Sequence, residues 1–226
     1  RIIGNRVNVA LLVFSAVLAT VGMIGGTRVP QVREETIVVN RLPEEADGLT
    51  VAVLADLHVD GITREDRVRK IVERTNALNP DIVVIAGDFV DGTVPVHGGD
   101  LRPLADLKAR YGVFGVPGNH EYYHFDISEK SGVLHEQIRD NVFLVNNTSA
   151  LHGNTKLIFS TLWSKINPSH QWQIERSMND FYQIKYKGFR FSGEIYNQLH
   201  EECLAFIQNE LETLNEEKVA VFTHHC

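Results

Sequence analysis

The chain has 226 residues, of which 43% are hydrophobic and 23% charged, the ordinary composition of a globular protein. These values exclude a disordered or collagen-like chain, and the two cysteines are too few for a disulfide framework. The formal net charge of −7 provides no basic face for a phosphate backbone, so we expect no stable nucleic-acid partner.

An uncharged apolar run occupies residues 7–26, between Arg6 and Arg28. Twenty helical residues rise about 30 Å, the thickness of a hydrocarbon core, whereas the apolar region of a signal peptide is shorter. The run predicts one transmembrane helix within residues 1–30, which holds the chain in a membrane. Arginines on both sides leave the membrane orientation open. Because the chain begins with Arg1, we expect a piece of a longer protein whose upstream part could hold further spans.

The region after the apolar run changes from a connector to alternating strands and helices. Residues 31–48 predict a polar connector with a first strand at 36–39. The domain that follows is expected at 49–226, with strands at 49–56, 81–88 and 112–116 and helices at 64–78 and near 101–110. Strands that are apolar on both faces and separated by helices indicate a parallel sheet covered on both sides.

The second half adds strands at 156–163, 189–192 and 219–223 and a helix at 194–214. Valine and arginine are concentrated before residue 150 and aromatic residues after it, yet no linker marks the change, so we expect one domain of mixed composition. The polar and aromatic segment 164–186 lacks one clear periodicity. We expect it to form a wall of the substrate cleft that acts on specificity through Trp172, with a purely structural cover as the alternative.

Four clusters of polar side chains follow four predicted strands. They are Asp56-Leu57-His58, Gly87-Asp88, Gly118-Asn119-His120-Glu121 and His224-His225. The carboxyl ends of parallel strands meet at one edge of a sheet, where open α/β sheets place their ligands. Each cluster alone is more typical of a helix cap or a turn. Four clusters in this order favour a common site.

The residue types in these clusters are metal ligands. In an extended chain Asp56 and His58 would point to the same side, so that a carboxylate and an imidazole could share one ion. Asp88 has two oxygens and can bridge two ions, and Asn119 supplies a neutral carbonyl oxygen. Mixed oxygen and nitrogen ligands without thiolate suit Mn, Fe or Zn.

In this order the motifs DLH (56–58), GDFVDG (87–92), GNHE (118–121) and THH (223–225) resemble those of the calcineurin-like metallophosphoesterase superfamily. The resemblance implies an α/β fold of two facing mixed β-sheets flanked by helices. Residues 1–125 resemble the membrane-anchored branch of the superfamily, whereas residues from about 154 onward resemble a soluble branch.

The resemblance also implies a function, the metal-dependent hydrolysis of a phosphomonoester or phosphodiester at two divalent metal ions. The first ion would be bound by Asp56 and His58, both ions by Asp88, and the second ion by Asn119 and His224, with His225 as the alternative. His120 would protonate the leaving-group oxygen or contact the phosphoryl group, and Asp91 would orient it.

Two positions depart from the pattern of the superfamily. Its last motif, Gly-His-x-His, is absent because the chain stops at Cys226, so we expect a C-terminally truncated domain. The alternative function is therefore an inactive, membrane-anchored fragment that keeps the fold with an incomplete metal site. Gly92 stands where protein-phosphatase relatives carry arginine, which argues against a phosphoprotein substrate.

Overall fold

The computed structural model describes residues 2–40, 42, 46–92, 94–123, 126–214 and 218–225. The chain divides into two compact units, residues 1–34 and residues 35–226. The first unit is built on helix α1 (Ile2–Thr27). Its stretch Asn5–Thr27 has a mean hydropathy of 2.3 and no buried residue, and it is the one helix in the described residues that is long and apolar enough to cross a membrane.

The connector that follows α1 is extended but unpaired. The strand expected at 36–39 is wrong, because residues 29–39 pair with no strand in the described part of the chain. Ile37 and Val38 are 83% and 87% exposed. β-Branched residues favour a strand where a neighbouring strand satisfies their backbone groups, and this segment has no such neighbour.

The first sheet of the second unit has five strands in the order β1-β2-β3-β5-β4. Its parallel strands are β1 (Val51–Leu54), β2 (Ile82–Ala86), β3 (Val113–Val116) and β5 (Val142–Asn146), and β4 (Leu134–Arg139) runs antiparallel to β5. The expected strands at 49–56, 81–88 and 112–116 are therefore confirmed within shorter bounds, whereas β4 and β5 were not expected.

Helical segments connect the parallel strands of this sheet. Helix α2 (Glu65–Ala77) follows β1 and buries Val68, Ile71, Val72 and Thr75. The short helix α3 (Val94–His97) and the 3-10 helix η2 (Gly98–Asp106) lie between β2 and β3. The helix expected near 101–110 thus forms earlier and in the 3-10 form, and Pro103 lies inside it.

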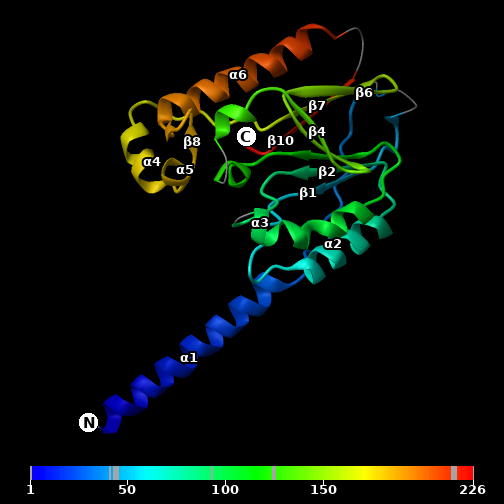
Figure 1. The fold of residues 1–226 in the computed structure, drawn as a ribbon. Coiled ribbons are helices and arrows are strands. Elements are labelled where there is room, and N and C mark those ends of the chain that lie inside the picture. The colour runs from blue at the N-terminus through cyan, green and yellow to red at the C-terminus, as the bar shows by residue number, and fades with distance from the viewer. Residues whose placement is uncertain are drawn as a thin grey trace. The chain divides into compact units, whose positions relative to one another are not determined.

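The second sheet has three strands in the order β10-β7-β6. They are β6 (Thr148–His152), β7 (Thr155–Ser160) and β10 (Lys218–Thr223), with β10 parallel and β6 antiparallel to β7. Helix α6 (Gly193–Glu212) packs beside this sheet and buries one stripe of side chains, Tyr196, Leu199, Cys203 and Ile207. Figure 1 shows α6 on one side of the strands and α2 on the other.

One hydrophobic core joins the two sheets. Ile82, Val84 and Val116 of the first sheet share a buried cluster with Leu157 and Phe159 of the second. The fold is therefore an α/β arrangement of mixed sheets flanked by helices, as expected. Residues from both sides of the composition change at residue 150 contribute to this core.

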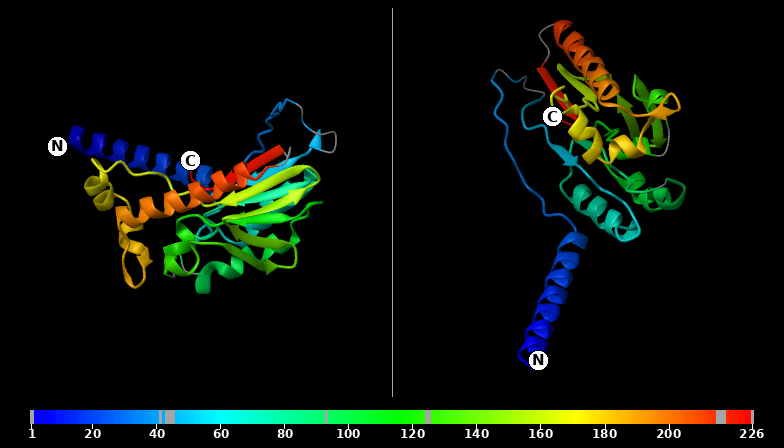
Figure 2. Two further views of the ribbon diagram at one scale, coloured as in Figure 1. Left: turned by 90° about the horizontal axis from the view of Figure 1, so that it is seen from above. Right: turned by 90° about the vertical axis from the view of Figure 1, so that its left-hand side faces the viewer.

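The residues between β7 and α6, 161–192, are called the cap segment here. They hold α4 (Gln171–Ser177), α5 (Asp180–Gln183) and the hairpin of β8 (Lys185–Tyr186) and β9 (Phe189–Arg190). Figure 2 shows these short elements beside the amino-terminal end of α6.

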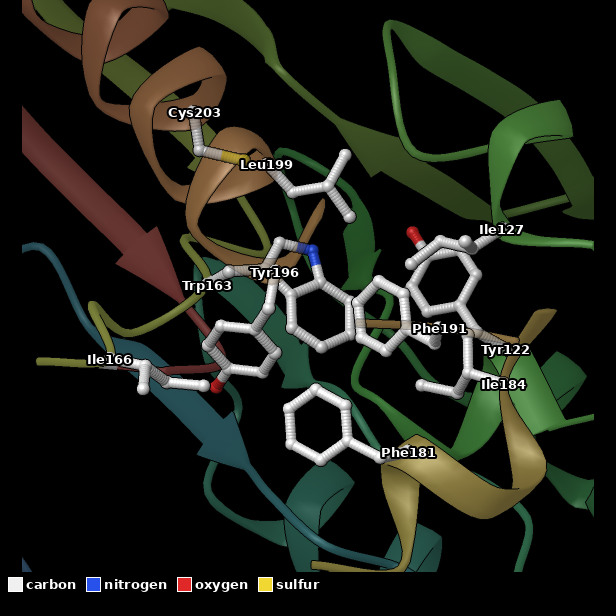
Figure 3. Packing of buried hydrophobic residues seen from close by; sticks show 10 residues of the cluster. All are labelled: Tyr122, Ile127, Trp163, Ile166, Phe181, Ile184, Phe191, Tyr196, Leu199 and Cys203. Carbon is white, nitrogen blue, oxygen red and sulfur yellow. The ribbon is translucent and has the colours of Figure 1, made fainter. Parts of the chain in front are cut away.

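An aromatic cluster fixes the cap segment to the domain. Trp163 lies at its centre, with ring centroids 5.1 Å from Tyr196 of α6, 5.8 Å from Phe191 and 5.7 Å from Tyr122. Phe181 of α5 is fully buried in the same cluster (Figure 3). The 3-10 helices η3 (His120–Tyr123) and η4 (Ile127–Glu129) supply its other wall through Tyr122 and Ile127.

Candidate metal centre

The loops after β1, β2, β3 and β10 meet at the carboxyl ends of these strands. The backbone N–H of His58 donates to the carbonyl oxygen of Asp88 at 2.9 Å, and the backbone N–H of His120 donates to Oδ1 of Asp88 at 3.0 Å. Nδ1 of His224 lies 2.8 Å from the carbonyl oxygen of Ala86. All four polar clusters are therefore held together around Asp88.

The chain leaves its strands here through left-handed backbone conformations. The φ angles of Asp56, His58 and Asp88 are 52°, 42° and 53°, a region that costs a non-glycine residue about 1 kcal/mol or more. The expected extended conformation of Asp56-Leu57-His58 is wrong, because the chain turns while Leu57 is buried at 4% exposure. The turn nevertheless places Oδ1 of Asp56 3.8 Å from Nε2 of His58.

Two glycines permit the close approach of these loops. Gly87 has a φ of +81°, and a Cβ there would lie 2.7 Å from Cγ of His224. A Cβ at Gly118 would lie 2.7 Å from the backbone nitrogen of Asp88 and still closer to its Oδ1. Any larger residue at either position would displace a candidate ligand.

Three groups surround the first candidate metal position. Ligand atoms of Asp56, His58 and Asp88 all lie within 4.8 Å of one another. Nε2 of His58 is 3.5 Å from Oδ2 of Asp88, whose side chain is 6% exposed, and Nδ1 of His58 is buried with no hydrogen-bond partner among the described residues. One imidazole nitrogen and two carboxylates are a ligand set for a divalent transition metal.

The second candidate position faces the other oxygen of Asp88. When Nδ1–H of His224 donates to the carbonyl of Ala86, Nε2 keeps its lone pair. That nitrogen is 3.2 Å from Oδ1 of Asn119 and 3.7 Å from Oδ1 of Asp88. Three acceptor atoms thus converge, and a cation could be held between them. The two oxygens of Asp88 therefore face two different groups of ligands, which fits a pair of divalent ions.

His120 lies beside both positions. Its Nε2 is 4.0 Å from Oδ2 of Asp88, and its Nδ1 is 3.2 Å from Oδ1 of Asp91. Its ring meets that of His58 edge to face, with centroids 4.7 Å apart. His58, Asp91 and His120 also form a second cluster within 4.8 Å, so Asp91 and His120 are close enough to serve as ligands themselves.

The two C-terminal histidines have different surroundings. His224 faces Asn119 and Asp88, whereas the ring of His225 packs against Trp163 with centroids 5.1 Å apart. Burial, together with the charge of His224, lowers the pKa of His225 to about 4. The geometry favours His224 as the ligand, and the assignment stays a prediction.

Glu121 supports the centre, a role that the sequence reasoning did not assign. Its carboxylate accepts backbone N–H groups from Gly118 at 2.7 Å, Phe89 at 2.8 Å and Asp88 at 3.0 Å. Burial, opposed by these donors, raises its pKa to about 7. Glu121 therefore ties the loop after β2 to the loop after β3. The sequence feature that could have indicated this role is the position of Glu121 three residues after Gly118, at the start of η3.

A cavity of about 450 Å³ adjoins the centre. Asn119 and His225 form its inner side, and most of the remaining wall comes from the cap segment and α6, including Ile166, Ile174, Met178, Asn179, Asp180 and Tyr196. Segment 164–186 thus lies where a cleft wall was expected. Trp172 does not line this cavity: its side chain is 71% exposed and stacks with Arg176. Its expected effect on specificity stays a prediction.

The fold and this edge of the sheet define an α/β protein with a cluster of nitrogen and oxygen atoms that could bind metal ions. Residues 49–225 match the family model of the calcineurin-like phosphoesterases, and the chain belongs to this family. The family inferred from the four motifs is thereby confirmed, and membership of this family implies divalent metal ions.

Known relatives are similar in sequence to part of this chain. A Danio rerio protein described as a transmembrane protein with metallophosphoesterase domain is 36% identical over 130 residues, covering 58% of this chain and 30% of that protein. An uncharacterized metallophosphoesterase of Helicobacter pylori is 40% identical over 103 residues, covering 46% of this chain and 27% of that protein. A crystal structure of a dimetal phosphatase from Danio rerio aligns over 78% of this chain and 69% of its own, with 16% identity and a TM-score of 0.40.

Proposed function

We propose that the chain hydrolyses a phosphomonoester or phosphodiester at a two-metal site. The observation that carries the proposal is the position of Asp88, a nearly buried carboxylate whose Oδ2 faces Nε2 of His58 and whose Oδ1 faces Nε2 of His224. A carboxylate that faces nitrogen ligands on both sides is suited to bridge two cations. Family membership supports the same reaction.

In this proposal the chain's own residues divide the work. Asp56 and His58 would hold one ion, Asn119 and His224 the other, and Asp88 both. Bound divalent ions, which the donor set suits as Mn, Fe or Zn, would supply Lewis-acid polarisation of the phosphoryl group and activation of the attacking water.

His120 is proposed as the residue that contacts the phosphoryl group or donates a proton to the leaving-group oxygen. Oδ1 of Asp91 lies 3.2 Å from its Nδ1 and is close enough to orient the ring. The proton to be delivered then resides on Nε2, on the side of Asp88.

We also propose that α1 attaches this activity to a membrane. The support is its apolar stretch Asn5–Thr27 and the likeness to a relative described as a transmembrane protein.

The test uses the full chain in detergent micelles with Mn²⁺ as the probe metal. Hydrolysis of p-nitrophenyl phosphate and bis(p-nitrophenyl) phosphate is measured for the wild type, for Asp88→Asn and for the control Asp140→Asn. Asp140 is an exposed carboxylate in the turn before β5, at the opposite end of that strand from the centre.

The proposal predicts metal-dependent hydrolysis by the wild type and the control, and loss of both hydrolysis and metal binding in Asp88→Asn. Metal binding without hydrolysis of either ester would favour the alternative, an inactive member that keeps the fold. Unchanged metal content in Asp88→Asn would refute the assignment of Asp88.

A further inference from the structure

A buried carboxylate from the cap segment lies behind the candidate centre. Asp180, the first residue of α5, is 4% exposed. Its Oδ1 accepts a hydrogen bond from Nδ2 of Asn119 at 2.9 Å and another from the hydroxyl of Tyr123 at 2.6 Å. Among the ion pairs of the described residues, none includes Asp180.

The contact between Asp180 and Asn119 decides which way the Asn119 amide points. With Nδ2 toward the carboxylate, Oδ1 faces Nε2 of His224 at 3.2 Å. The reversed amide would set its oxygen against a carboxylate oxygen and its NH₂ toward the metal position. An NH₂ group cannot ligate a cation, so only the first orientation makes Asn119 a ligand.

The position of Asp180 is itself fixed by packing. The next residue, Phe181, is fully buried and stacks on Phe191 with centroids 5.6 Å apart (Figure 3). The hydroxyl of Tyr123 holds the same carboxylate oxygen from the side of η3.

We propose that Asp180 is a positioning residue for the metal centre, which orients the Asn119 amide so that its oxygen faces the metal. The inference rests on the proposed function, since it requires Asn119 to be a ligand. A cation bound at Oδ1 of Asn119 would also be attracted by the buried carboxylate of Asp180 behind that ligand. Outer partners of this kind orient the ligands of many metal sites.

The first experiment measures Mn²⁺ affinity by isothermal titration calorimetry on the full chain in detergent. Asp180→Asn keeps the shape of the side chain but replaces a carboxylate, which only accepts hydrogen bonds, with an amide that can also donate. The Asn119 amide is then no longer held in one orientation. We expect the Mn²⁺ affinity of this variant to fall about 10- to 100-fold, the usual effect of losing an outer partner. The control Asp140→Asn removes the same charge from an exposed turn and should bind as the wild type does.

A residue exchange separates orientation from general damage to the fold. In the Asn119→Asp background the ligand has two equivalent oxygens, and its charge is repelled by Asp180. Adding Asp180→Asn there should raise Mn²⁺ affinity, because the amide introduced on α5 can donate to one of these oxygens while the other faces the metal. A merely structural role predicts a loss in both backgrounds. Far-UV circular dichroism checks that each variant is folded. If Asp180→Asn alone does not fold, the comparison of Mn²⁺ affinity between Asn119→Asp and the double variant Asn119→Asp with Asp180→Asn still tests the inference.

The outcomes separate the inference from the proposed function. If the wild type binds no Mn²⁺, the proposed metal site is refuted and the inference with it. If the wild type binds Mn²⁺ and Asp180→Asn binds equally well, or if Asp180→Asn lowers affinity in both backgrounds, the orienting role of Asp180 is refuted while the metal site stands.

Discussion

Gly118 offers a sharp test of the geometry around Asp88. A Cβ at this position would lie 2.9 Å from Cγ of Asp88. Carbon atoms pack without strain at about 3.5 Å, so in Gly118→Ala the carboxylate must retreat by at least about 0.6 Å. Metal–ligand distances tolerate only about 0.2 Å, so the retreat disrupts a ligand shared by both ions.

The expected effects of Gly118→Ala follow from this displacement. Overpacking of this kind costs about 1–3 kcal/mol of stability, and loss of the shared ligand should lower Mn²⁺ affinity at least about 10-fold. Calorimetric titration and urea unfolding of the full chain measure the two effects. Gly132→Ala is the matched control, because a Cβ at Gly132 meets nothing within 4 Å. Wild-type Mn²⁺ affinity in Gly118→Ala would refute the reasoning.

Three further predictions concern stability and attachment. The carboxylate of Asp81 accepts hydrogen bonds from the backbone N–H and the hydroxyl of Thr50, and the backbone hydrogen bond lowers the pKa of Asp81 below the usual 3.8. These hydrogen bonds therefore stabilise the fold above pH 3.8, and the stabilisation is lost as the pH falls through the lowered pKa. Asp81→Asn should therefore lower the free energy of unfolding by about 1 kcal/mol or less at pH 7. Urea unfolding at a series of pH values should show this difference shrinking as the pH falls below 3.8, and a difference that does not change with pH would contradict the pKa assignment. Trp163→Ala, which leaves a cavity at the centre of the aromatic cluster, should lower the free energy of unfolding in urea by about 3–5 kcal/mol. Trp172→Ala, at an exposed side chain, should lower it by about 1 kcal/mol or less, and equal losses in the two variants would contradict the packing described for Trp163. Deleting residues 1–34, a separate compact unit, should release the domain from the membrane fraction without detergent, and continued sedimentation with membranes would show that another surface attaches it.

The parts of the fold that the sequence predicted are those with strong local patterns. Central strands such as β2 are buried on both faces and read as continuous apolar runs. The strands β4 and β6 were missed because they lie at sheet edges, where every second residue faces solvent and the apolar signal is weak. The connector at 36–39 shows the opposite error, since its apolar residues had the composition of a strand but no pairing partner.

The candidate site, like the fold, could be predicted from the sequence only in part. Asp56, Asp88, Asn119 and His224 could be proposed from the sequence because each lies shortly after the end of a strand, and parallel strands place their carboxyl ends at one edge. Asp180 was not found, because it contacts Asn119 across 61 residues and no local pattern encodes that contact. Left-handed turns at Asp56 and His58 were missed as well, since such conformations are imposed by the meeting of loops.

The central claim is that Asp88 bridges two metal ions, and an anomalous difference map from crystals of the chain grown with Mn²⁺ tests it most directly. The account predicts two peaks about 3.5–4 Å apart, one beside each carboxylate oxygen of Asp88, with His58 at one peak and His224 at the other. Absence of any peak at this carboxylate, or peaks only elsewhere on the chain, would contradict the account.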